Sequence, residues 1–340
     1  MTPALVVVDA DVLGRERTGD ETYVLNLLRH LPAAAAGELR FVAMTRRPDV
    51  VPEGVEAVHV PARSQELRMA WSVPRTLHRL QPALAHFQHA LPLRCPCPAV
   101  VTIHDLSFER DPSLMRLADR LVFKTVVPRA ARNAAHVLAV SDRTKADVVG
   151  LYGVPPERIA VTPHGVDPIF SPGEGGGRSY ALFVGAVQER KNPLAAVEAA
   201  QAAGLRLVVV GPARDTELAR EVARRGADVR GYVTQAELAD LYRGAACLVM
   251  PSRYEGFGLP VLEAMASGTP VVATPDPALR EVAGDAAVFV PPERLADGIR
   301  AALADRQRLV AAGLGRARLF SWDETARRTV AVYLEVLGLA

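Results

Sequence analysis

The chain has 340 residues, of which 49% are hydrophobic and 5% aromatic, and its formal net charge is +2. That length fits two domains of ordinary size. The balanced charge, with no block of like sign, excludes the strongly basic surface that is typical of nucleic-acid-binding proteins.

Cysteine usage and the N-terminal segment bear on the compartment. Three cysteines, Cys95, Cys97 and Cys247, make no disulfide framework, which favours a reducing, cytoplasmic setting. Cys95 and Cys97 resemble half a metal site, but no second Cys or His pair stands at ligand spacing. The N-terminus has no basic leader, and no apolar stretch approaches the ~20 residues that span a bilayer. We therefore expect a soluble protein without a metal centre.

Short valine-rich runs alternate with helical patterns along almost the whole chain. Strands are predicted at Leu5–Val8, Arg40–Met44, Val100–Ile103, His136–Val140, Tyr180–Val184, Leu205–Val210, Cys247–Met250, Pro270–Ala273 and Ala287–Val290. These runs do not alternate apolar with polar residues, which is the pattern of parallel strands buried on both faces. Strand–helix alternation of this kind predicts doubly wound α/β sheets.

Helices are predicted between the strands. Val24, Leu27, Leu28 and Leu31 follow the i, i+3, i+4, i+7 spacing of an amphipathic helix. Asn192-Pro193 predicts an N-cap followed by proline at the first helical position. Capping-box spacing occurs twice, at Thr234 with Glu237 and at Ser321 with Glu324.

The most glycine-rich stretch, Ser171–Arg178, predicts a linker between two halves that each carry a strand series. We expect an N-terminal Rossmann-like domain over residues 1–170 and a C-terminal one over 178–318. A final helix over 321–340 has an apolar stripe but no following strand, so it must dock elsewhere. The linker also suggests that the two domains close on a ligand.

Ligands of open α/β sheets bind beyond the carboxyl ends of the strands, so the loops there are the candidate sites. The first loop carries Gly14 and Gly19 before a helix, a setting that suits a phosphate and also suits an ordinary flexible loop. Asp9-Ala-Asp11 has the spacing of a metal motif but lacks partner ligands. His104, after the strand Val100–Ile103, is either a hydrogen-bond donor to a bound sugar or a buried histidine bonded to a neighbour.

The loop after Tyr180–Val184 runs from Gly185 to Arg190 and Lys191 at the start of a helix. Only three of the 40 basic residues are lysines, so a lysine here is unusual. A lysine at a helix start supplies positive charge where a diphosphate leaving group becomes negative. The alternative is a solvated basic pair.

The loop after Cys247–Met250 is the most informative stretch. Gly256 and Gly258 allow a tight turn, and Pro260 suits a first helical turn. Glu263 then falls in an apolar helix, where an unpartnered carboxylate is costly to bury and ribose hydroxyls would satisfy it. Glu255 would lie nearer a sugar. A surface glutamate or a buried ion pair is the alternative for either residue alone.

These motifs together resemble the retaining glycosyltransferases of family 4. The segment PSRYEGFGLPVLEAMASGTPVVA is similar to the family's signature of two glutamates separated by seven residues. VGAVQERKN is similar to the donor-phosphate loop, VTPHGVDPIF to the end of the first domain and GRERTGDETYVLNLL to the glycine-rich first loop. The resemblance covers essentially the whole chain. It implies the GT-B fold, in which two Rossmann-like domains face each other across a cleft and the C-terminal helix packs back on the first domain.

The resemblance also implies roles for individual residues. Glu263 would bind the donor ribose, Glu255 would orient the transferred sugar, and Lys191 would neutralise the diphosphate. His104 would contact the donor sugar, and Gly19 would bring backbone toward the phosphates. The expected catalytic residues are His104, Lys191 and Glu255. The expected donor-binding residues are Gly19, Gly185, Arg190, Lys191, Glu255, Gly256, Phe257, Gly258, Leu259 and Glu263, with no metal ligand.

One position departs from the family pattern. Many members carry arginine directly after the glycine of the donor loop, where this chain has Ala186. Arg190 is the candidate replacement. Glu281 lies in a segment that is similar to the family, but we assign no ligand to it.

The implied reaction moves a sugar, with mannose favoured, from a nucleoside diphosphate to a glycan or lipid-linked acceptor hydroxyl. GDP-mannose is the favoured donor and UDP-sugars are the alternative. Retention and front-side attack are implied by the resemblance. Independence of metal is expected because no Asp-x-Asp element stands in a convincing metal-binding loop. A nucleotide-sugar epimerase of the same fold and a non-catalytic nucleotide-sugar-binding subunit stay open, whereas a dehydrogenase is disfavoured because no G-x-G-x-x-G follows a strand.

A basic, partly apolar segment precedes the second half of the first domain. Arginines interleave there with apolar residues at Arg63, Arg68, Met69, Trp71, Arg75, Leu77 and Arg79. They are either an amphipathic surface for peripheral contact with the inner membrane face or a solvated helix face that Pro74 breaks.

Overall fold

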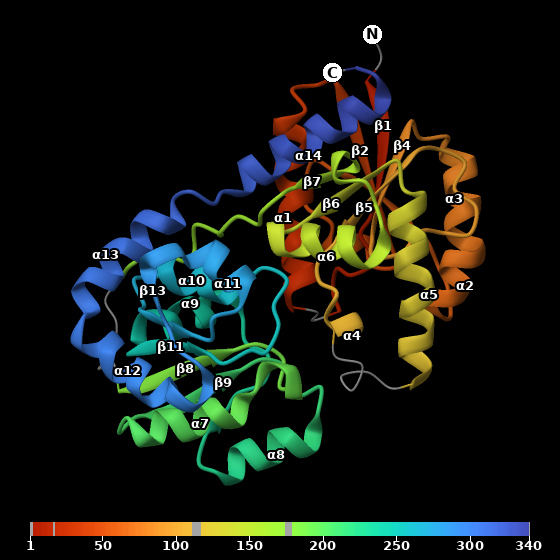
Figure 1. Cartoon of the computed structure of the whole chain (residues 1–340). Helices are drawn as coiled ribbons and strands as arrows, with labels where there is room; N and C mark the ends of the chain where they lie inside the picture. The colour runs from red at the N-terminus through yellow and green to blue at the C-terminus, as the bar shows by residue number, and fades with distance from the viewer. Residues whose placement is uncertain (1–2, 16–17, 111–116, 174–178, 340) are drawn as a thin grey trace. The chain divides into compact units, whose positions relative to one another are not determined.

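The computed structural model describes residues 3–15, 18–110, 117–173 and 179–339 (Figure 1). The chain forms two compact units. The first contains Met1–Gly165 and Trp322–Ala340, and the second contains Val166–Ser321.

The first unit is built on a seven-stranded sheet with the order β3-β2-β1-β4-β5-β6-β7, and every described pairing in it is parallel. Its strands are β1 (Ala4–Asp9), β2 (Leu39–Thr45), β3 (Glu56–His59), β4 (Leu84–Gln88), β5 (Ala99–Ile103), β6 (His136–Ala139) and β7 (Ile159–Val161). Its helices are α1 (Thr18–Ala34), α2 (Gln65–Leu67), α3 (Val73–Leu80), α4 (Ser107–Arg110), α5 (Leu117–Asn133), α6 (Asp142–Tyr152) and α14 (Trp322–Leu337).

The second unit has a six-stranded sheet with the order β10-β9-β8-β11-β12-β13, again with parallel pairing throughout its described strands. The strands are β8 (Tyr180–Val184), β9 (Arg206–Val210), β10 (Asp228–Val229), β11 (Cys247–Met250), β12 (Val271–Ala273) and β13 (Ala287–Phe289). The helices are α7 (Pro193–Ala202), α8 (Thr216–Arg224), α9 (Gln235–Gly244), α10 (Leu259–Ala266), α11 (Pro277–Ala283), α12 (Leu295–Ala304) and α13 (Arg306–Ala317).

The strand orders locate the ligand-binding edge of each sheet. In the first sheet the chain runs outward from β1 through β2 to β3 and then returns to β4 on the other side of β1. In the second sheet it runs from β8 through β9 to β10 and returns to β11 beside β8. Each return makes a topological switch point, where diverging loops leave room for a ligand beyond the carboxyl ends of the strands.

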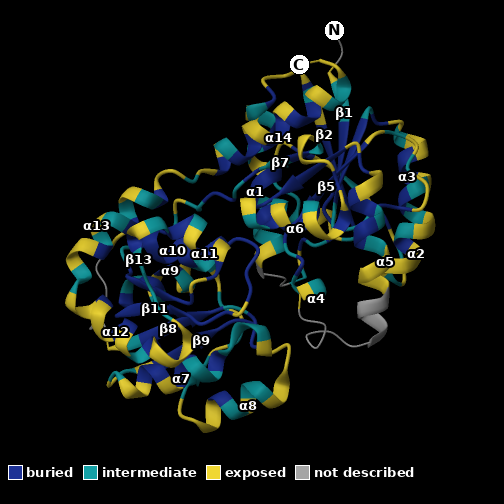
Figure 2. Cartoon of the chain, viewed as in Figure 1, coloured by how far each residue is buried: buried dark blue, intermediate teal, exposed yellow. Residues whose placement is uncertain are grey.

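The strands carry the core because their valines, leucines and alanines are covered on both faces (Figure 2). Val6, Val7 and Val8 are fully buried in β1, and Leu182 and Phe183 are fully buried in β8. The continuous apolar runs in the sequence therefore reflect helices packed on both sides of each sheet.

The last helix, α14, belongs to the first unit and packs along α1. Tyr333 is fully buried, and its hydroxyl lies 2.6 Å from Nδ1 of His86 in β4. Thr325 donates a hydrogen bond to the carbonyl of Pro163. The expectation that the C-terminal helix packs back on the first domain is confirmed.

Nine predicted strands appear as β1, β2, β5, β6, β8, β9, β11, β12 and β13, with ends shifted by at most one residue. Four further strands, β3, β4, β7 and β10, were not predicted from the sequence. β7 and β10 have three and two residues, too few for a pattern, and β3 is half-exposed at the sheet edge. β4 contains the buried polar residue His86, which interrupts its apolar run.

Helix signals met mixed outcomes. Thr234 and Glu237 form the predicted capping box at the start of α9. Asn192 stands at the predicted N-cap of α7 and Pro193 opens the helix, but Asn192 adopts a left-handed conformation with φ 51° and its side chain makes no capping bond. The tight turn from Glu189–Lys191 into α7 imposes this conformation, which asparagine tolerates better than most residues.

Of the predicted linker Ser171–Arg178, residues 174–178 lie outside the described part of the chain. Phe170 packs edge-on against Tyr242, and Arg243 donates hydrogen bonds to the carbonyls of Ile169 and Ser171. The segment directly before the predicted linker is thus held by α9 of the second unit.

Within the described residues, no helix has the length and apolarity that crossing a membrane requires.

Candidate active site

The loops after β8 and β11 flank the switch point of the second sheet, and they bring together three of the residues predicted for the donor site: Arg190, Lys191 and Glu255. The Lys191 ammonium donates to both carboxylate oxygens of Glu255, at 2.6 and 2.7 Å. Both side chains are largely buried, with 12% and 7% exposure. A charge-assisted pair of this kind is stronger than a neutral hydrogen bond and fixes the positions of both groups.

Arg190 strengthens the same junction. Its guanidinium donates to the carbonyl of Tyr254 at 2.6 Å and lies 3.6 Å from the Glu255 carboxylate. The Arg253 amide in turn donates to the Arg190 carbonyl at 2.9 Å. The two loops are therefore joined by backbone as well as side chains, and two cations surround one carboxylate.

Gly185 and Gly211 explain how the donor loop fits under its neighbour. Gly211 has φ +139°, and a Cβ on it would lie 2.2 Å from the Gly185 carbonyl oxygen. The stem of Lys191 passes over Gly185, where a Cβ would touch its Cδ and Cε at 3.9 Å. Only glycine permits this approach of the loops that follow β8 and β9.

Gly258 turns the chain into α10 with φ 114°, a conformation that strongly favours glycine. Leu259 and Pro260 then open the helix, whose dipole favours negative charge at this end. Phe257 is buried and packs edge-on against Phe320, with ring centroids 6.0 Å apart. The turn that includes Gly256 is thereby anchored to the core of the second unit.

Glu263 lies in the second turn of α10 and is only 8% exposed. The Tyr242 hydroxyl donates to its carboxylate at 2.8 Å. Burial raises the pKa of Glu263 to about 7, the Tyr242 bond opposes this shift, and the negative charge of Asp167 adds to it. An acid poised near neutrality is typical of functional sites.

Two neighbouring residues were missed by the sequence analysis. Tyr242 lies 21 positions before Glu263, and nothing local links the two. Asp276 accepts from the Glu255 amide at 3.3 Å and also caps α11. The Asp276-Pro277 pair has the N-cap and first-position pattern, so that signal was present in the sequence.

In the first unit, His104 follows β5 and is 7% exposed. Its Nε2 lies 2.9 Å from Oε1 of Gln88, and the Tyr23 ring meets it edge-on at 4.8 Å. Burial lowers the pKa of His104 to about 4, with the Asp20 carboxylate opposing and His89 assisting. His104 is thus a neutral, buried imidazole at the carboxyl edge of the first sheet. Its contact with Gln88 agrees with the second of the two predicted interpretations, a buried histidine bonded to a neighbour.

Gly19 lies exposed in the first turn of α1, and a Cβ on it would meet no atom within 4 Å. Within the described part of the first unit, there is space for a side chain at this position.

The Asp9-Ala-Asp11 motif is engaged by arginines. Asp9 pairs with Arg68, and Asp11 accepts from Arg46 at 2.9 and 2.6 Å. Arg68 is fully buried, which corrects its assignment to an exposed basic surface. The ion pairs with β1 account for its burial, because an unpaired guanidinium would not be stable inside the unit.

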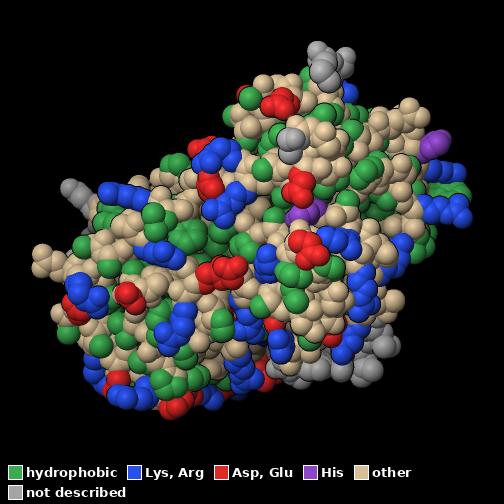
Figure 3. All heavy atoms as spheres, turned by 45° about the horizontal axis from the view of Figure 1, so that its top comes forward, with side chains coloured by type: hydrophobic (Ala, Val, Ile, Leu, Met, Phe, Trp, Pro, Cys, Tyr) green, Lys and Arg blue, Asp and Glu red, His purple; other side chains and the backbone are tan. Residues whose placement is uncertain are grey.

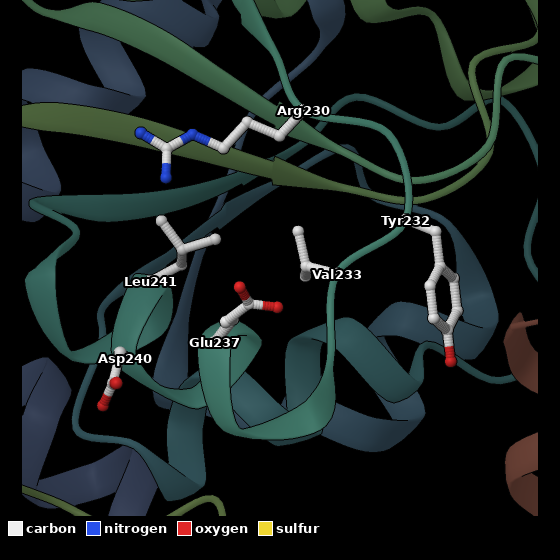
Figure 4. A pocket seen from close by; sticks show the side chains of 6 residues that line it. All are labelled: Arg230, Tyr232, Val233, Glu237, Asp240 and Leu241. Atoms are coloured by element: carbon white, nitrogen blue, oxygen red, sulfur yellow. The ribbon is translucent and has the colours of Figure 1, made fainter.

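The surface offers a hollow of about 490 Å³ beside α9 (Figure 4). It is lined by Arg230, Tyr232, Val233, Glu237, Asp240 and Leu241. Its charged groups are engaged, since Arg230 pairs with Asp228, Glu237 closes the capping box and Asp240 pairs with Arg243. None of the residues predicted for the donor site lines this hollow.

Two family models match the chain. The model described as Glycosyltransferase Family 4 matches residues 17–170, and the one described as Glycosyl transferases group 1 matches residues 169–314. Among curated proteins, the chain is similar to O-antigen chain mannosyltransferase B of Escherichia coli. The identity is 30% over 266 residues, which are 69% of this chain and 70% of that relative. The chain spans 58%, 60% and 49% of the lengths of three further relatives.

Among solved structures, sucrose-phosphate synthase from Thermosynechococcus elongatus has a TM-score of 0.80 at 22% identity, over 99% of this chain and 100% of that one. Anabaena HepE in complex with UDP and glucose has a TM-score of 0.74 at 17% identity, over 98% and 99% of the two chains. Likeness at such identity shows the fold, and it confirms the prediction of two Rossmann-like domains of the GT-B class. The chain belongs to glycosyltransferase family 4.

Proposed function

We propose that this glycosyltransferase is a retaining hexosyltransferase that moves a sugar, with mannose favoured, from a nucleoside diphosphate to an acceptor hydroxyl. One observation carries the proposal: Lys191 and Glu255 lie on the two loops that flank the switch point of the second sheet, and Glu263 lies in α10, the helix that follows the second of these loops. A nucleotide sugar needs a cation for its diphosphate and carboxylates for its hydroxyls, and these elements supply both.

Each residue has a proposed role. The Glu263 carboxylate accepts hydrogen bonds from the ribose hydroxyls, and Tyr242 orients it. Glu255 orients the transferred sugar while holding Lys191, whose ammonium contacts a phosphate oxygen. Gly185, Gly256, Phe257, Gly258 and Leu259 shape the loops, and Gly19 brings backbone of the first unit toward the phosphates.

Charge stabilisation is the main contribution proposed for the protein. As the sugar–phosphate bond breaks, negative charge builds on the diphosphate, and Lys191, Arg190 and the start of α10 stabilise it. The departing phosphate accepts the proton of the acceptor hydroxyl that attacks on the same face. We propose that no metal takes part and that His104 contacts the transferred sugar. Arg190 compensates for Ala186, because its guanidinium lies 3.6 Å from Glu255.

GDP-mannose is the proposed donor, supported by the mannosyltransferase name of the Escherichia coli relative. UDP-sugars are the alternative, because Anabaena HepE was solved with UDP and glucose. The proposed acceptor is a glycan or a lipid-linked hydroxyl of cell-surface polysaccharide synthesis. We propose a cytoplasmic setting, consistent with cysteines at 95, 97 and 247 that form no disulfide.

Peripheral membrane contact is proposed for a smaller surface than the sequence suggested. Trp71 is 59% exposed, Leu67 is 56% exposed, and the Arg75 guanidinium stacks 3.9 Å above the Trp71 ring. Leu77 is buried in the core. On the face shown in Figure 3, basic side chains are scattered among acidic and neutral ones rather than gathered in one block.

Donor binding is the first experiment. Calorimetry and thermal shift against GDP-mannose, UDP-glucose, UDP-N-acetylglucosamine, GDP, UDP and NAD would use the native chain and Glu263→Ala. Binding of one donor together with its nucleoside diphosphate, lost in the variant, supports the proposal. Binding of NAD alone contradicts it.

Turnover separates the alternatives that share this site. A nucleotide-sugar epimerase would convert the donor without any acceptor, and a binding subunit would bind donor and never consume it. Product analysis of donor incubated with and without a lipid-linked oligosaccharide fraction distinguishes both from sugar transfer.

A further inference from the structure

Three side chains converge at the carboxyl edge of the first sheet, near its own switch point. Asp20 lies in the first turn of α1, His89 directly follows β4, and His104 directly follows β5. A ring nitrogen of each histidine and a carboxylate oxygen of Asp20 all lie within 4.8 Å of one another. The three residues come from segments up to 84 positions apart, so only the fold brings them together.

The protonation of His104 leaves one nitrogen available. Gln88 presents its amide oxygen to His104 Nε2 at 2.9 Å, and an oxygen accepts only, so Nε2 carries the proton. The lone pair is then on Nδ1, which is buried and has no hydrogen-bond partner among the described residues. A ligating histidine commonly donates its other N–H to an oxygen in this way.

His89 shares one of these features, since its Nδ1 is also buried without a hydrogen-bond partner among the residues that the structure describes. Two buried imidazole nitrogens without partners are costly unless something occupies them.

We propose that Asp20, His89 and His104 form a binding site for a divalent transition-metal ion of the Zn²⁺ class. Two imidazoles and one carboxylate suit Zn²⁺, Co²⁺ or Ni²⁺, whereas Mg²⁺ and Ca²⁺ prefer oxygen ligands. Three protein ligands leave a fourth position open to water or a ligand hydroxyl. Ligand spacing along the chain does not reveal this site, because its three residues lie up to 84 positions apart.

The three ligand atoms must move closer together to bind a metal ion. Zinc bonds of about 2.0–2.1 Å in a tetrahedral site place ligand atoms about 3.4 Å apart, so contacts as long as 4.8 Å must shorten. Asp20 is half-buried, whereas His104 is held by Gln88 and Tyr23, so the carboxylate is the group that moves.

Metal binding has a consequence that rests on the proposed function. A metal on Nδ1 of His104 neutralises the charge of the Asp20 carboxylate. It also blocks the imidazole that we propose contacts the transferred sugar. Zn²⁺ then inhibits transfer by the native chain, whereas Asp20→Asn retains its metal-free rate in the presence of Zn²⁺.

The test is calorimetric titration of the metal-free chain with Zn²⁺, with the visible absorption of added Co²⁺ as a second readout. The variants are Asp20→Asn and His89→Ala, and His59→Ala is the matched control because His59 is an exposed histidine of the same unit. We expect one Zn²⁺ per chain, unaffected by millimolar Mg²⁺. Affinity should fall at least about tenfold in both variants and stay unchanged in the control.

Equal Zn²⁺ affinity of the native chain and Asp20→Asn, with no Co²⁺ absorption assignable to nitrogen ligands, would overturn the proposal. Far-ultraviolet circular dichroism of each variant shows whether it is folded. Because these readouts need no donor or acceptor, failure of the metal site is distinguishable from failure of the proposed sugar transfer.

Discussion

Glu263 is a buried acid whose protonation controls two properties of the second unit. Its pKa is raised from 4.5 to about 7, chiefly by burial. The folded state therefore holds the proton between about pH 4.5 and 7, where the unfolded state has released it. Stability from this group is fully present below pH 4.5 and is lost as the pH rises toward 7, by roughly 3 kcal/mol.

Donor affinity should follow the opposite direction, because ribose hydroxyls donate to the ionised carboxylate. We expect affinity to rise as the pH passes through about 7. Glu263→Gln should weaken binding by about 1.5–3 kcal/mol and remove the pH dependence. Tyr242→Phe, which removes the bond that lowers the pKa, should move the midpoint upward. Calorimetry from pH 6 to 8 checks this, and an unchanged profile in Glu263→Gln would exclude this residue as the titrating group.

Lys191 and Glu255 form a hydrogen-bonded ion pair at the carboxyl edge of the second sheet, so a change in one residue affects the other. Lys191→Ala leaves the Glu255 carboxylate with Arg190 as its nearest cation, at 3.6 Å. We expect kcat/KM to fall about 10²- to 10³-fold, the usual effect of removing a group that stabilises developing charge. Arg253→Ala is the control, since Arg253 is exposed beside the same loop and pairs with Glu189. Steady-state kinetics should show less than about a twofold effect there, and equal losses in both variants would contradict the role of Lys191.

Among elements, the donor loop depends on how closely the loops after β8 and β9 approach. Gly211→Ala would place a Cβ 2.2 Å from the Gly185 carbonyl oxygen, so the loop must move. We expect a loss of more than about 2 kcal/mol in the free energy of unfolding, together with weaker donor binding.

Gly204→Ala is the matched control for Gly211→Ala. Gly204 also has positive φ, +77°, but a Cβ there meets open space. It should cost about 1–2 kcal/mol from the left-handed conformation alone and leave donor affinity unchanged. Denaturant unfolding and calorimetry of both variants check this prediction. If Gly204→Ala weakened donor binding as much as Gly211→Ala, the close approach to Gly185 would not be the cause.

Elements differ in how well the sequence predicts them. The continuous apolar runs of β1, β8 and β11 predict buried strands because helices cover both faces. Runs as short as β7 and β10 carry no such pattern, and their pairing depends on neighbouring strands. A single proline is also ambiguous. Pro74 suggested a break in a helix, but it lies in the first turn of α3.

At the scale of the whole molecule, acid should destabilise the first unit. Burial lowers the pKa of His86 to about 3 and that of His104 to about 4, and holds that of His164 well below 6.5. Below pH 6.5 the unfolded state binds protons that the folded state does not. Stability is therefore lost as the pH falls from 6.5 toward 4, by about 2 kcal/mol at pH 5 for each of His86 and His104.

Intrinsic fluorescence isolates this effect. The two tryptophans, Trp71 and Trp322, both belong to the first unit, so their emission reports its unfolding. We expect a lower unfolding temperature at pH 5 than at pH 7, with a smaller difference in His104→Gln than in the control His59→Gln. The same difference in both variants would show that His104 does not contribute.

Sequence alone determined the two-domain α/β class and which residue types stand on the second-unit loops. Strand burial, caps and the glycine turn before α10 are local, because residues within about ten positions specify them. The spacing between Glu255 and Glu263, and the place of Lys191 just before a helix, could therefore be read from the sequence.

Tertiary structure decided everything that depends on strand order. It placed Lys191 on Glu255, Tyr242 on Glu263 and Arg68 on Asp9, pairs that lie 64, 21 and 59 positions apart. It also gathered Asp20, His89 and His104. The physical reason is that parallel sheets bring the carboxyl ends of distant strands to one edge, whereas local spacing carries no information about which strands are neighbours.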